Sequence, residues 1–243
     1  MARTAGIVLI GNEILSGKVV DVNAAYLCRE LRSLGVLVRR IAVIPDEVDL
    51  IAAEVGGQSA TFDFVFTSGG VGPTHDDVTI EGVARAMGVA VVRHPDLVEA
   101  IERLSRGPMN EGRLKMSEVP EGAVLVAAEG LAIPAVTIRN IYVLPGVPEI
   151  FRQKFDALKE QFRDVPFHLC SVFVNMPESV LATHLNDLLG QHPDLLLGSY
   201  PEFFNAEYKV KVTLESKDRG YVERAVTYLL ERIPAAALVR VDR

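Results

Sequence analysis

The sequence contains no tryptophan, and aromatic residues make up only 7% of its 243 positions. Proteins that bind single-stranded nucleic acid without sequence preference stack the bases on aromatic side chains, which are scarce in this chain. Basic residues are also outnumbered, with 25 Lys and Arg against 32 Asp and Glu and a net charge of −7. Because nucleic-acid-binding domains are usually basic, we expect no nucleic-acid partner.

Cysteine is equally scarce: Cys28 and Cys170 are the only two, and both lie in mostly apolar sequence. Without paired or clustered cysteines, neither a disulfide framework nor a structural zinc site is expected. The sequence also has no apolar run long enough to span a bilayer and no signal-peptide pattern. We therefore expect a cytoplasmic protein with no membrane partner.

Three common nucleotide and hydrolase motifs are absent from the sequence. They are the phosphate-binding pattern G-x-x-x-x-G-K-[ST], the dinucleotide fingerprint G-x-G-x-x-G and the nucleophile elbow G-x-S-x-G. A P-loop enzyme, a Rossmann dehydrogenase and a serine hydrolase of the elbow type are therefore not expected.

The first two thirds of the sequence alternate short apolar runs with segments of helical periodicity. Residues 6–10 and 62–66 are apolar runs typical of strands buried on both faces of a parallel sheet. Apolar residues recur at helical spacing after Asn23, and further helices are predicted over 79–87 and 95–104. This alternation predicts an α/β domain with a mostly parallel sheet over residues 1–165.

The pattern changes after the segment 163–166. Strands, helices and turns over residues 166–243 follow the order β-α-β-β-α-β, the arrangement of ferredoxin-like domains. We therefore expect a second, small α+β subdomain over residues 166–243.

The most informative segment runs from Thr67 to Thr79, between a predicted strand and a predicted helix. Its glycines let the backbone come close to a ligand, and its amide groups can bind an anion. The same turn carries Asp76 and Asp77, whose charges would repel a phosphate. A divalent cation held by the two carboxylates removes that conflict, because Mg²⁺ binds in this way with substrate phosphates.

A simpler interpretation of this segment is a well-capped helix. Thr74 and Asp77 have the spacing of a capping box, and acidic residues suit the first turn of a helix. That interpretation explains neither the group of glycines nor the second aspartate. His75, in the same polar turn, is expected to be an exposed bystander.

Other polar residues should lie near this turn, because ligands of open α/β sheets bind beyond the carboxyl ends of the strands. Glu13 follows the first predicted strand and Asp46 follows the second. Taken singly, each of these acids has an ordinary local role. As a set with Asp76 and Asp77, they converge around one cation. Lys115, from an irregular stretch, is placed to reach a phosphate.

The segment Ser68–Thr79 resembles the signature of molybdopterin-binding domains of the MoaB/Mog type. Ile10–Gly17, Asp21–Asn23 and Leu144–Glu149 resemble the CinA branch of that superfamily. The resemblance implies an α/β/α sandwich of three layers with its site at the glycine turn, and it implies self-association into a homo-oligomer.

The end of the chain, at 197–201 and 208–216, is similar to the N-terminal molybdopterin-binding-like domain of eukaryotic FAD synthases. The CinA and FAD-synthase branches are associated with metal-dependent hydrolysis of the pyrophosphate in ADP-ribose or FAD. Val22 stands where the branch usually has threonine, and two further features depart from the CinA pattern. Asn12 stands where the branch usually has aspartate, and Leu131–Pro134 lacks a typical Gly-Thr-Ala-Pro-Gly motif.

The glycine–aspartate turn predicts a metal-assisted phosphate-ester site, and the resemblance implies a pyrophosphatase that hydrolyses an adenylyl pyrophosphate, FAD or ADP-ribose, with Mg²⁺, Mn²⁺ or Co²⁺. Asp76 and Asp77 are the expected catalytic residues and, with Asp46, the expected metal ligands. The residues expected to bind substrate are Asn12, Glu13, Ser68, Gly69, Gly70, Gly72, Pro73, Thr74, Lys115, Gly146 and Pro148. The alternatives are a module that binds a pterin or nucleotide without chemistry, and adenylyl transfer to molybdopterin.

Overall fold

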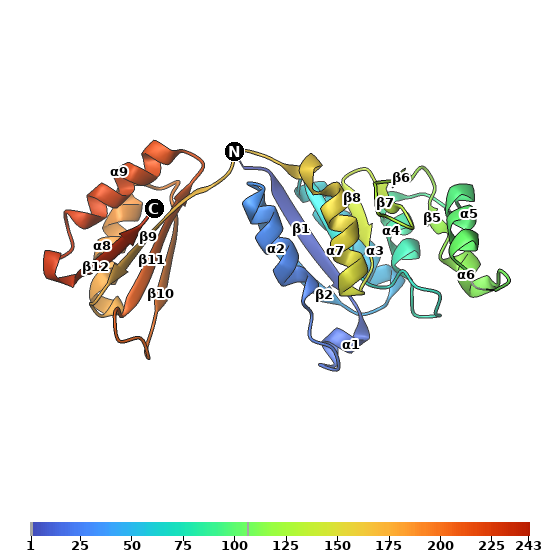
Figure 1. Ribbon diagram of the computed structural model, residues 1–243, viewed down its shortest axis with the longest axis horizontal. Helices are drawn as coiled ribbons and strands as arrows, with labels where there is room; N and C mark the ends of the chain where they lie inside the picture. The colour runs from blue at the N-terminus through green and yellow to red at the C-terminus, as the bar shows by residue number, and fades with distance from the viewer. Residues whose placement is uncertain (1, 106) are drawn as a thin grey trace. The chain divides into compact units, whose positions relative to one another are not determined.

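The computed structural model of the protein describes residues 2–105 and 107–243 (Figure 1). The chain divides into two compact units, Met1–Asp164 and Val165–Arg243. The expected boundary between residues 165 and 166 lies one residue away from this division. In the described part of the chain, no helix is long and apolar enough to cross a membrane.

The first unit is built on a six-stranded sheet with the order β2-β1-β3-β8-β7-β6. Four adjacent strands are parallel, and the last two are antiparallel to their neighbours. The strands are β1 (Thr4–Ile10), β2 (Leu37–Ile44), β3 (Phe64–Ser68), β8 (Ile141–Leu144), β7 (Ala135–Ile138) and β6 (Val124–Val126). The predicted mostly parallel sheet is therefore confirmed.

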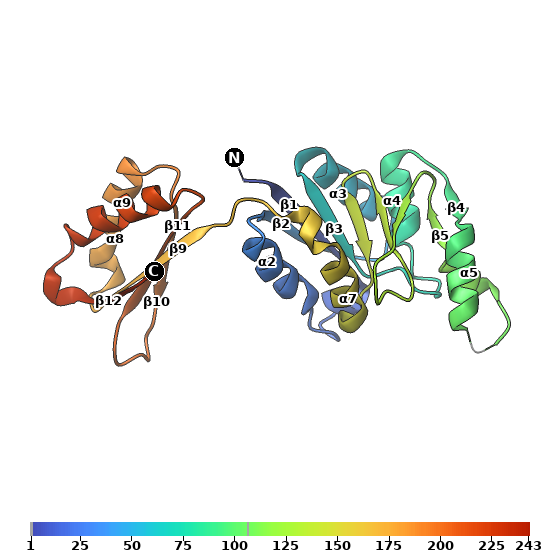
Figure 2. The same ribbon diagram turned by 45° about the horizontal axis from the view of Figure 1, so that its top comes forward.

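Helices cover both faces of this sheet and make it the middle of three layers (Figure 2). One face packs against α2 (Asn23–Ser33), α7 (Pro148–Leu158) and the 3₁₀ turn Lys159–Phe162. The other packs against α3 (Val48–Thr61) and α4 (Thr79–Met87). The predicted α/β/α sandwich is thus confirmed.

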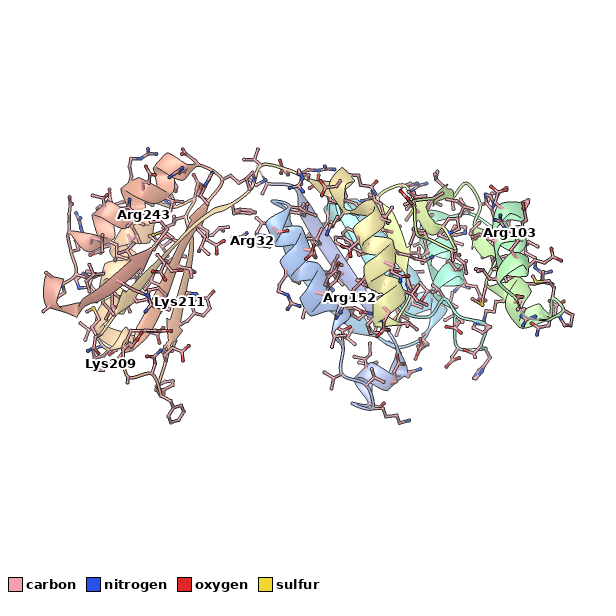
Figure 3. All side chains as sticks on the ribbon, in the orientation of Figure 1. Arg32, Arg103, Arg152, Lys209, Lys211 and Arg243 are labelled. Atoms are coloured by element: carbon pink, nitrogen blue, oxygen red, sulfur yellow. The ribbon has the colours of Figure 1, made fainter. Side chains whose placement is uncertain are left out.

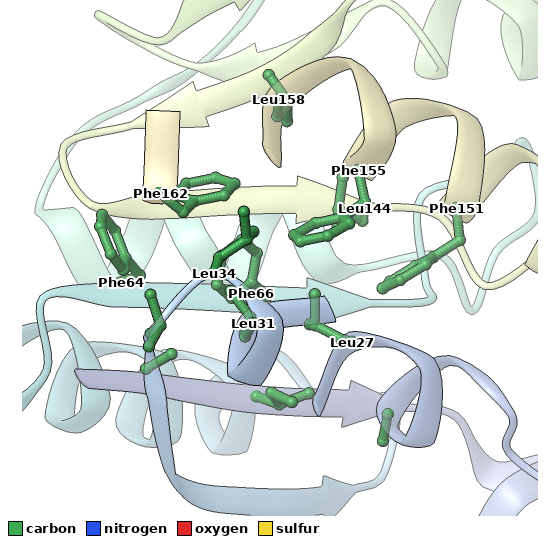
Figure 4. Close-up of a cluster of buried hydrophobic side chains, with 14 of the residues drawn as sticks. Leu27, Leu31, Leu34, Phe64, Phe66, Leu144, Phe151, Phe155, Leu158 and Phe162 are labelled. Carbon is green, nitrogen blue, oxygen red and sulfur yellow. The ribbon is translucent and has the colours of Figure 1, made fainter. Parts of the chain in front are cut away.

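Strand β1 supplies both layers because its side chains alternate between the two faces. Ile7 and Leu9 join the cluster under α2 and α7, whereas Val8 and Ile10 join the cluster under α3 and α4. Aromatic side chains from β3, α7 and the 3₁₀ turn pack together in the first cluster (Figure 4). Burying each such side chain contributes about 1.5–3 kcal/mol to folding.

Smaller elements surround the sheet of the first unit. Helix α1 (Asn12–Leu15) follows β1 after the single residue Gly11. Helices α5 (Pro95–Leu104) and α6 (Glu111–Lys115) flank the two-stranded sheet of β4 (Val91–Arg93) and β5 (Glu118–Pro120).

The second unit has the order β9-α8-β10-β11-α9-β12, and its antiparallel sheet has the strand order β10-β11-β9-β12. This is the predicted ferredoxin-like arrangement. Both helices pack their apolar faces on the sheet, in a cluster of buried residues separate from those of the first unit. The elements are β9 (His168–Val174), α8 (Glu178–Gln191), β10 (Leu196–Pro201), β11 (Val210–Ser216), α9 (Arg219–Leu230), a 3₁₀ turn (Ala235–Ala237) and β12 (Leu238–Asp242).

Candidate functional site

The glycine turn begins where β3 ends, at the carboxyl edge of the parallel strands. Gly69 has φ +105° and Gly70 has φ +63°, a backbone region that favours glycine. A Cβ at Gly69 would overlap the carbonyl oxygen of Ile10, and one at Gly70 would overlap the hydroxyl of Thr79. Glycine is therefore required at these two positions because other parts of the chain pack against them, and not because a ligand does.

The turn is held by hydrogen bonds to its neighbours. The Thr79 hydroxyl donates to Gly69 O at 2.9 Å, and the Thr79 N–H donates to Gly70 O at 3.0 Å. The Gly69 N–H donates to Leu144 O at 3.2 Å, so it is not free to bind a phosphate oxygen. In the described part of the chain, the N–H groups of Gly70 and Gly72 have no protein acceptor. These two amides are the ones the turn can offer to an anion.

Asn23, the first residue of α2, joins the loops that follow β3 and β8. Its side-chain amide donates to Ser68 Oγ at 3.0 Å and to Gly146 O at 2.9 Å. The side chain is buried, and its Oδ1 atom has no partner within residues 2–105 and 107–243. Sequence analysis did not select Asn23 as a site residue, although it stands in the segment that resembles the CinA branch.

Gly146 and Pro148 belong to the loop after β8, which runs beside the glycine turn. A Cβ on Gly146 would lie 3.4 Å from the Cα of Gly69, so the two loops are in contact. Pro148 is the first residue of α7, where its missing N–H costs nothing.

The two adjacent aspartates are organised by Thr74. The Thr74 N–H donates to Asp77 Oδ2 at 2.8 Å, and its hydroxyl lies 2.5 Å from Asp77 Oδ2 and 2.6 Å from Asp76 Oδ1. Helix α4 begins only at Thr79 and has no side-chain cap. The capping-box interpretation is therefore wrong, because these hydrogen bonds close a separate turn ahead of the helix.

Asp76 is exposed, and its hydrogen bond from the Thr74 hydroxyl holds the pKa of its carboxyl below the usual value. The charges of His75 and Lys115 act in the same direction. His75 is exposed, and its Nδ1 lies 3.9 Å from Asp76 Oδ1. The exposed carboxylate of Asp76 is thus ionised at neutral pH, as a cation ligand requires.

Lys115 lies at this turn, as expected. It is the last residue of α6, and its Nζ donates to Thr74 O at 2.6 Å. Pro73 is exposed and lies against the same helix, since a Cβ on Gly112 would be 3.3 Å from the Cβ of Pro73. Helix α6 therefore brings one positive charge to the rim of the glycine turn.

The remaining predicted acids have local partners. Asp46 Oδ2 accepts the N–H of Asn12 at 2.8 Å, which ties the loop after β2 to the loop after β1. Glu13 is exposed in α1 and folds back over Gly11. Within the described ranges, no three His, Cys, Asp or Glu side chains lie close enough together to hold a metal ion. The expected convergence of Glu13 and Asp46 with Asp76 and Asp77 around one cation is therefore not found in these ranges, and Asp76 and Asp77 remain as an adjacent pair of carboxylates at the turn.

A cavity of about 360 Å³ opens beside the turn. Gly72, Asp77 and Lys115 line it on the side of the glycine turn. Most of the other lining side chains are apolar and come from α4, α5, the segment 131–134, β7 and β8. The site thus combines a charged mouth with an apolar interior, as is typical of small-molecule sites.

Lys154, on α7, also lines this cavity and was not selected from the sequence. Its Nζ donates to Pro134 O at 2.7 Å. Burial lowers the pKa of its ammonium group to about 8. A lysine in a helical pattern gives no sequence signal of this kind, because only the packing of α7 against the segment before β7 buries it.

Comparisons with known proteins match the two units to two families. The family described as "probable molybdopterin binding domain" matches residues 6–164, and the "FAD synthase, middle domain" family matches residues 166–242. A protein of Archaeoglobus fulgidus is 40% identical over 183 residues, which cover 75% of this chain and 79% of the relative. A probable FAD synthase of Caenorhabditis elegans is 35% identical over 94% of this chain and 50% of its own length.

The chain therefore spans about half the length of that FAD synthase relative. Among solved structures, the protein CinA of Thermoplasma acidophilum superposes with a TM-score of 0.61 and 30% identity. The match covers 66% of this chain and 98% of CinA, whose function is described as unknown. From these matches and the shared fold, the chain belongs to the molybdopterin-binding domain family, and its second unit is similar to the FAD synthase middle domain.

Proposed function

We propose that the site binds a nucleotide with an adenylyl pyrophosphate, such as FAD or ADP-ribose, and hydrolyses it to AMP and a second phosphate ester. The observation that carries this proposal is the meeting of Gly72, Asp77 and Lys115 at the mouth of the apolar cavity. A dinucleotide has charged phosphates and flat rings, and this cavity offers complementary surfaces for both.

The chain's own residues bind and orient the pyrophosphate. The free N–H groups of Gly70 and Gly72 donate to phosphate oxygens, and the Lys115 ammonium adds a positive charge beside them. The hydrogen bonds of Thr74 fix the two carboxylates before the substrate arrives. Preorganised charges of this kind lower the reorganisation cost of the reaction.

Asp76 and Asp77 would hold a divalent cation together with phosphate oxygens. Two carboxylates without a third protein ligand suit Mg²⁺, which keeps several waters and binds through one or two carboxylates plus substrate phosphates. When bound, such a cation polarises a phosphoryl oxygen and lowers the pKa of a coordinated water. One water is consumed, and the P–O–P bridge is the bond that breaks.

Product analysis tests the proposal. The purified chain is incubated with FAD, ADP-ribose, NAD or ATP, each with Mg²⁺, Mn²⁺ or Co²⁺, and the products are resolved by chromatography. AMP released from FAD or ADP-ribose, and lost on chelation, is the expected result. Absence of AMP with every pair of nucleotide and metal would overturn the hydrolase.

A second candidate is a module that binds a pterin or nucleotide without chemistry. It is favoured by the absence, in the described segments, of a third acidic side chain near Asp76 and Asp77. Asn12 also favours a binding module, because the CinA branch usually has a charged aspartate at this position and asparagine carries no charge. Tight binding without turnover would support this candidate, whereas ATP consumption only with molybdopterin present would indicate adenylyl transfer.

A further inference from the structure

Lys154 has more hydrogen-bonding capacity than the protein uses. An ammonium group carries three donors, and one of them reaches Pro134 O at 2.7 Å. Within the ranges that the structure describes, no carboxylate forms an ion pair with this lysine, and desolvation is the one cause that lowers its pKa. Burying such a group is unfavourable unless a further acceptor arrives with a ligand.

The ammonium group lies near the carboxyl edge of the sheet, at the level of the glycine turn. Pro134 directly precedes β7, and the pairing of Val136 with Val143 places it beside the end of β8. Lys154 lies six residues along α7 from Pro148, a rise of about 9 Å. Its long side chain therefore turns back to the same edge from which the glycine turn starts.

The walls around Lys154 suit a flat ring. Leu97, Ile133, Val136 and Val143 line the cavity with apolar surface. The other charged side chains that line it are Asp77, Glu81, Lys115 and Glu118. Of these, Asp77 and Lys115 belong to the mouth, where the phosphates of the proposed substrate bind.

We infer that Lys154 determines specificity for the ring half of the ligand, by donating a charge-assisted hydrogen bond to a ring carbonyl oxygen. This inference rests on the proposed function and names its substrate class: a nucleotide whose second half is a carbonyl-bearing heteroaromatic ring, such as a flavin or a pterin. ADP-ribose lacks that ring and leaves the apolar walls uncovered. Adenine offers ring nitrogens but no carbonyl oxygen to the ammonium group, so it is the weaker ligand for this cavity.

The same lysine makes ring binding depend on pH. Burial lowers the pKa of Lys154 to about 8, so the ammonium loses its proton between pH 7 and pH 9. The charge-assisted hydrogen bond is lost with that proton. Affinity for the carbonyl-bearing ring is therefore expected to fall over this interval.

Riboflavin tests the inference, because it carries the ring but no phosphate and needs no metal. Its dissociation constant is measured by fluorescence for the wild type, Lys154→Met and the control Arg152→Met at pH 7 and pH 9. Arg152 lies on the same helix, is exposed and lies over the Tyr26 ring instead of lining the cavity (Figure 3). The control therefore removes a positive charge from α7 without touching the cavity.

At pH 7 we expect Lys154→Met to weaken riboflavin binding by about tenfold or more, the value of one charge-assisted hydrogen bond. The control is expected to bind like the wild type. Wild-type affinity should fall several-fold from pH 7 to pH 9, and the Met variant should show no such fall. The wild-type pH profile needs no variant, so a folding defect in Lys154→Met would leave the inference testable.

Three results would overturn the inference. They are wild-type affinity of the Met variant for riboflavin, equal weakening of riboflavin and adenosine in that variant, and failure of riboflavin to bind the wild type at all. Hydrolysis is scored separately with ADP-ribose and FAD. AMP release without riboflavin binding would overturn this inference alone, and riboflavin binding without AMP release would overturn the hydrolase alone.

Discussion

At the scale of single residues, Asp77 has two roles, one in the structure of the turn and one at the cavity. Its carboxylate accepts the N–H and hydroxyl of Thr74, and it also borders the cavity. Asp77→Asn keeps an oxygen that can accept the Thr74 N–H but removes the charge. We expect AMP release to fall by about 100-fold or more, since loss of a metal-binding carboxylate removes the cation from the site.

Two measurements check this expectation: the rate of AMP release and the thermal unfolding midpoint. Asp187→Asn is the matched control, since Asp187 is exposed on α8 in the second unit. It should change neither quantity. Retained turnover in Asp77→Asn, with the control also active, would remove Asp77 from the mechanism.

Replacing Lys154 with an uncharged residue is expected to increase the stability of the folded protein. The pKa of Lys154 falls from 10.5 to about 8 on folding, so below pH 8 the folded state carries the cost of a buried charge. This lowering of the pKa corresponds to about 3 kcal/mol, and the hydrogen bond to Pro134 that the variant loses offsets about 1 kcal/mol of it. Lys154→Met should therefore raise the free energy of unfolding by about 2 kcal/mol at pH 7.

The sign of this effect sets its pH dependence. The cost is fully present below pH 8 and disappears between pH 8 and pH 10.5, where the unfolded chain also loses the proton. Urea unfolding at pH 7 and pH 10 checks this: the advantage of the Met variant should shrink at the higher pH. A variant less stable than the wild type at pH 7 would contradict a net cost of the partly buried Lys154 ammonium.

Sequence reasoning located the glycine–aspartate turn and the approach of Lys115 to it, but not the roles of individual atoms. The glycine pattern was interpreted as a site for a ligand. In the structure, Gly69 and Gly70 are glycines because Ile10 and Thr79 leave no space for a Cβ. The role of Asn23 could not be predicted either, because it depends on contacts with Ser68 and Gly146, which are far away in the sequence. Such contacts depend on which strands become neighbours, and that information is spread over the whole chain.

At the scale of elements, the glycine turn itself can be tested. Gly69→Ala forces a Cβ onto the carbonyl oxygen of Ile10 in addition to the strain of its positive φ. Gly122 has a similar φ of +81° but open space around it, so Gly122→Ala carries the strain alone. We expect a loss of about 1–2 kcal/mol for Gly122→Ala and clearly more, about 3 kcal/mol or above, for Gly69→Ala.

Urea denaturation of the two variants against the wild type gives both values. Equal losses would mean that the backbone relaxes around the new methyl group and that the turn is not held by Ile10. A larger loss in Gly69→Ala, with AMP release reduced as well, would tie the geometry of the turn to its function.

The boundaries of most helices and strands followed from the sequence, and the exceptions have physical causes. The glycines at positions 56 and 57 favour a helix end, but helix α3 continues through them to Thr61. Glycine is a poor helix former, yet a Cβ on Gly56 would lie only 3.7 Å from that of Ala86 on α4. The close packing of the two helices overrides the local preference, and no local pattern reports it.

At the scale of the whole molecule, the order of predicted strands and helices was enough to predict the six-stranded and the four-stranded sheet. It could not show that β7 and β6 turn antiparallel, because a short apolar run carries no direction. The cavity depends on this reversal, since β7 brings Pro134 back to the carboxyl edge where Lys154 meets it. The position of Lys154 at the cavity thus depends on the strand topology, which local sequence patterns do not report.

The two units have separate cores, which predicts that the second folds alone. Its buried cluster contains Leu181, Val212 and Leu214, with partners only from residues 165–243. A fragment of residues 165–243 should unfold cooperatively in urea. Leu214→Ala, at a fully buried position, should destabilise the fragment and the full chain by the same amount, about 2–5 kcal/mol.

Leu169→Ala is the control for this comparison, because Leu169 lies on β9 with 49% of its surface exposed. It should change stability by less than about 1 kcal/mol in either background. A fragment without a cooperative transition would mean that the second core needs the first unit to form. If Leu214→Ala lowers the free energy of unfolding equally in the fragment and in the full chain, the second unit folds independently. Variants at the glycine turn can then be interpreted without correction for the second unit.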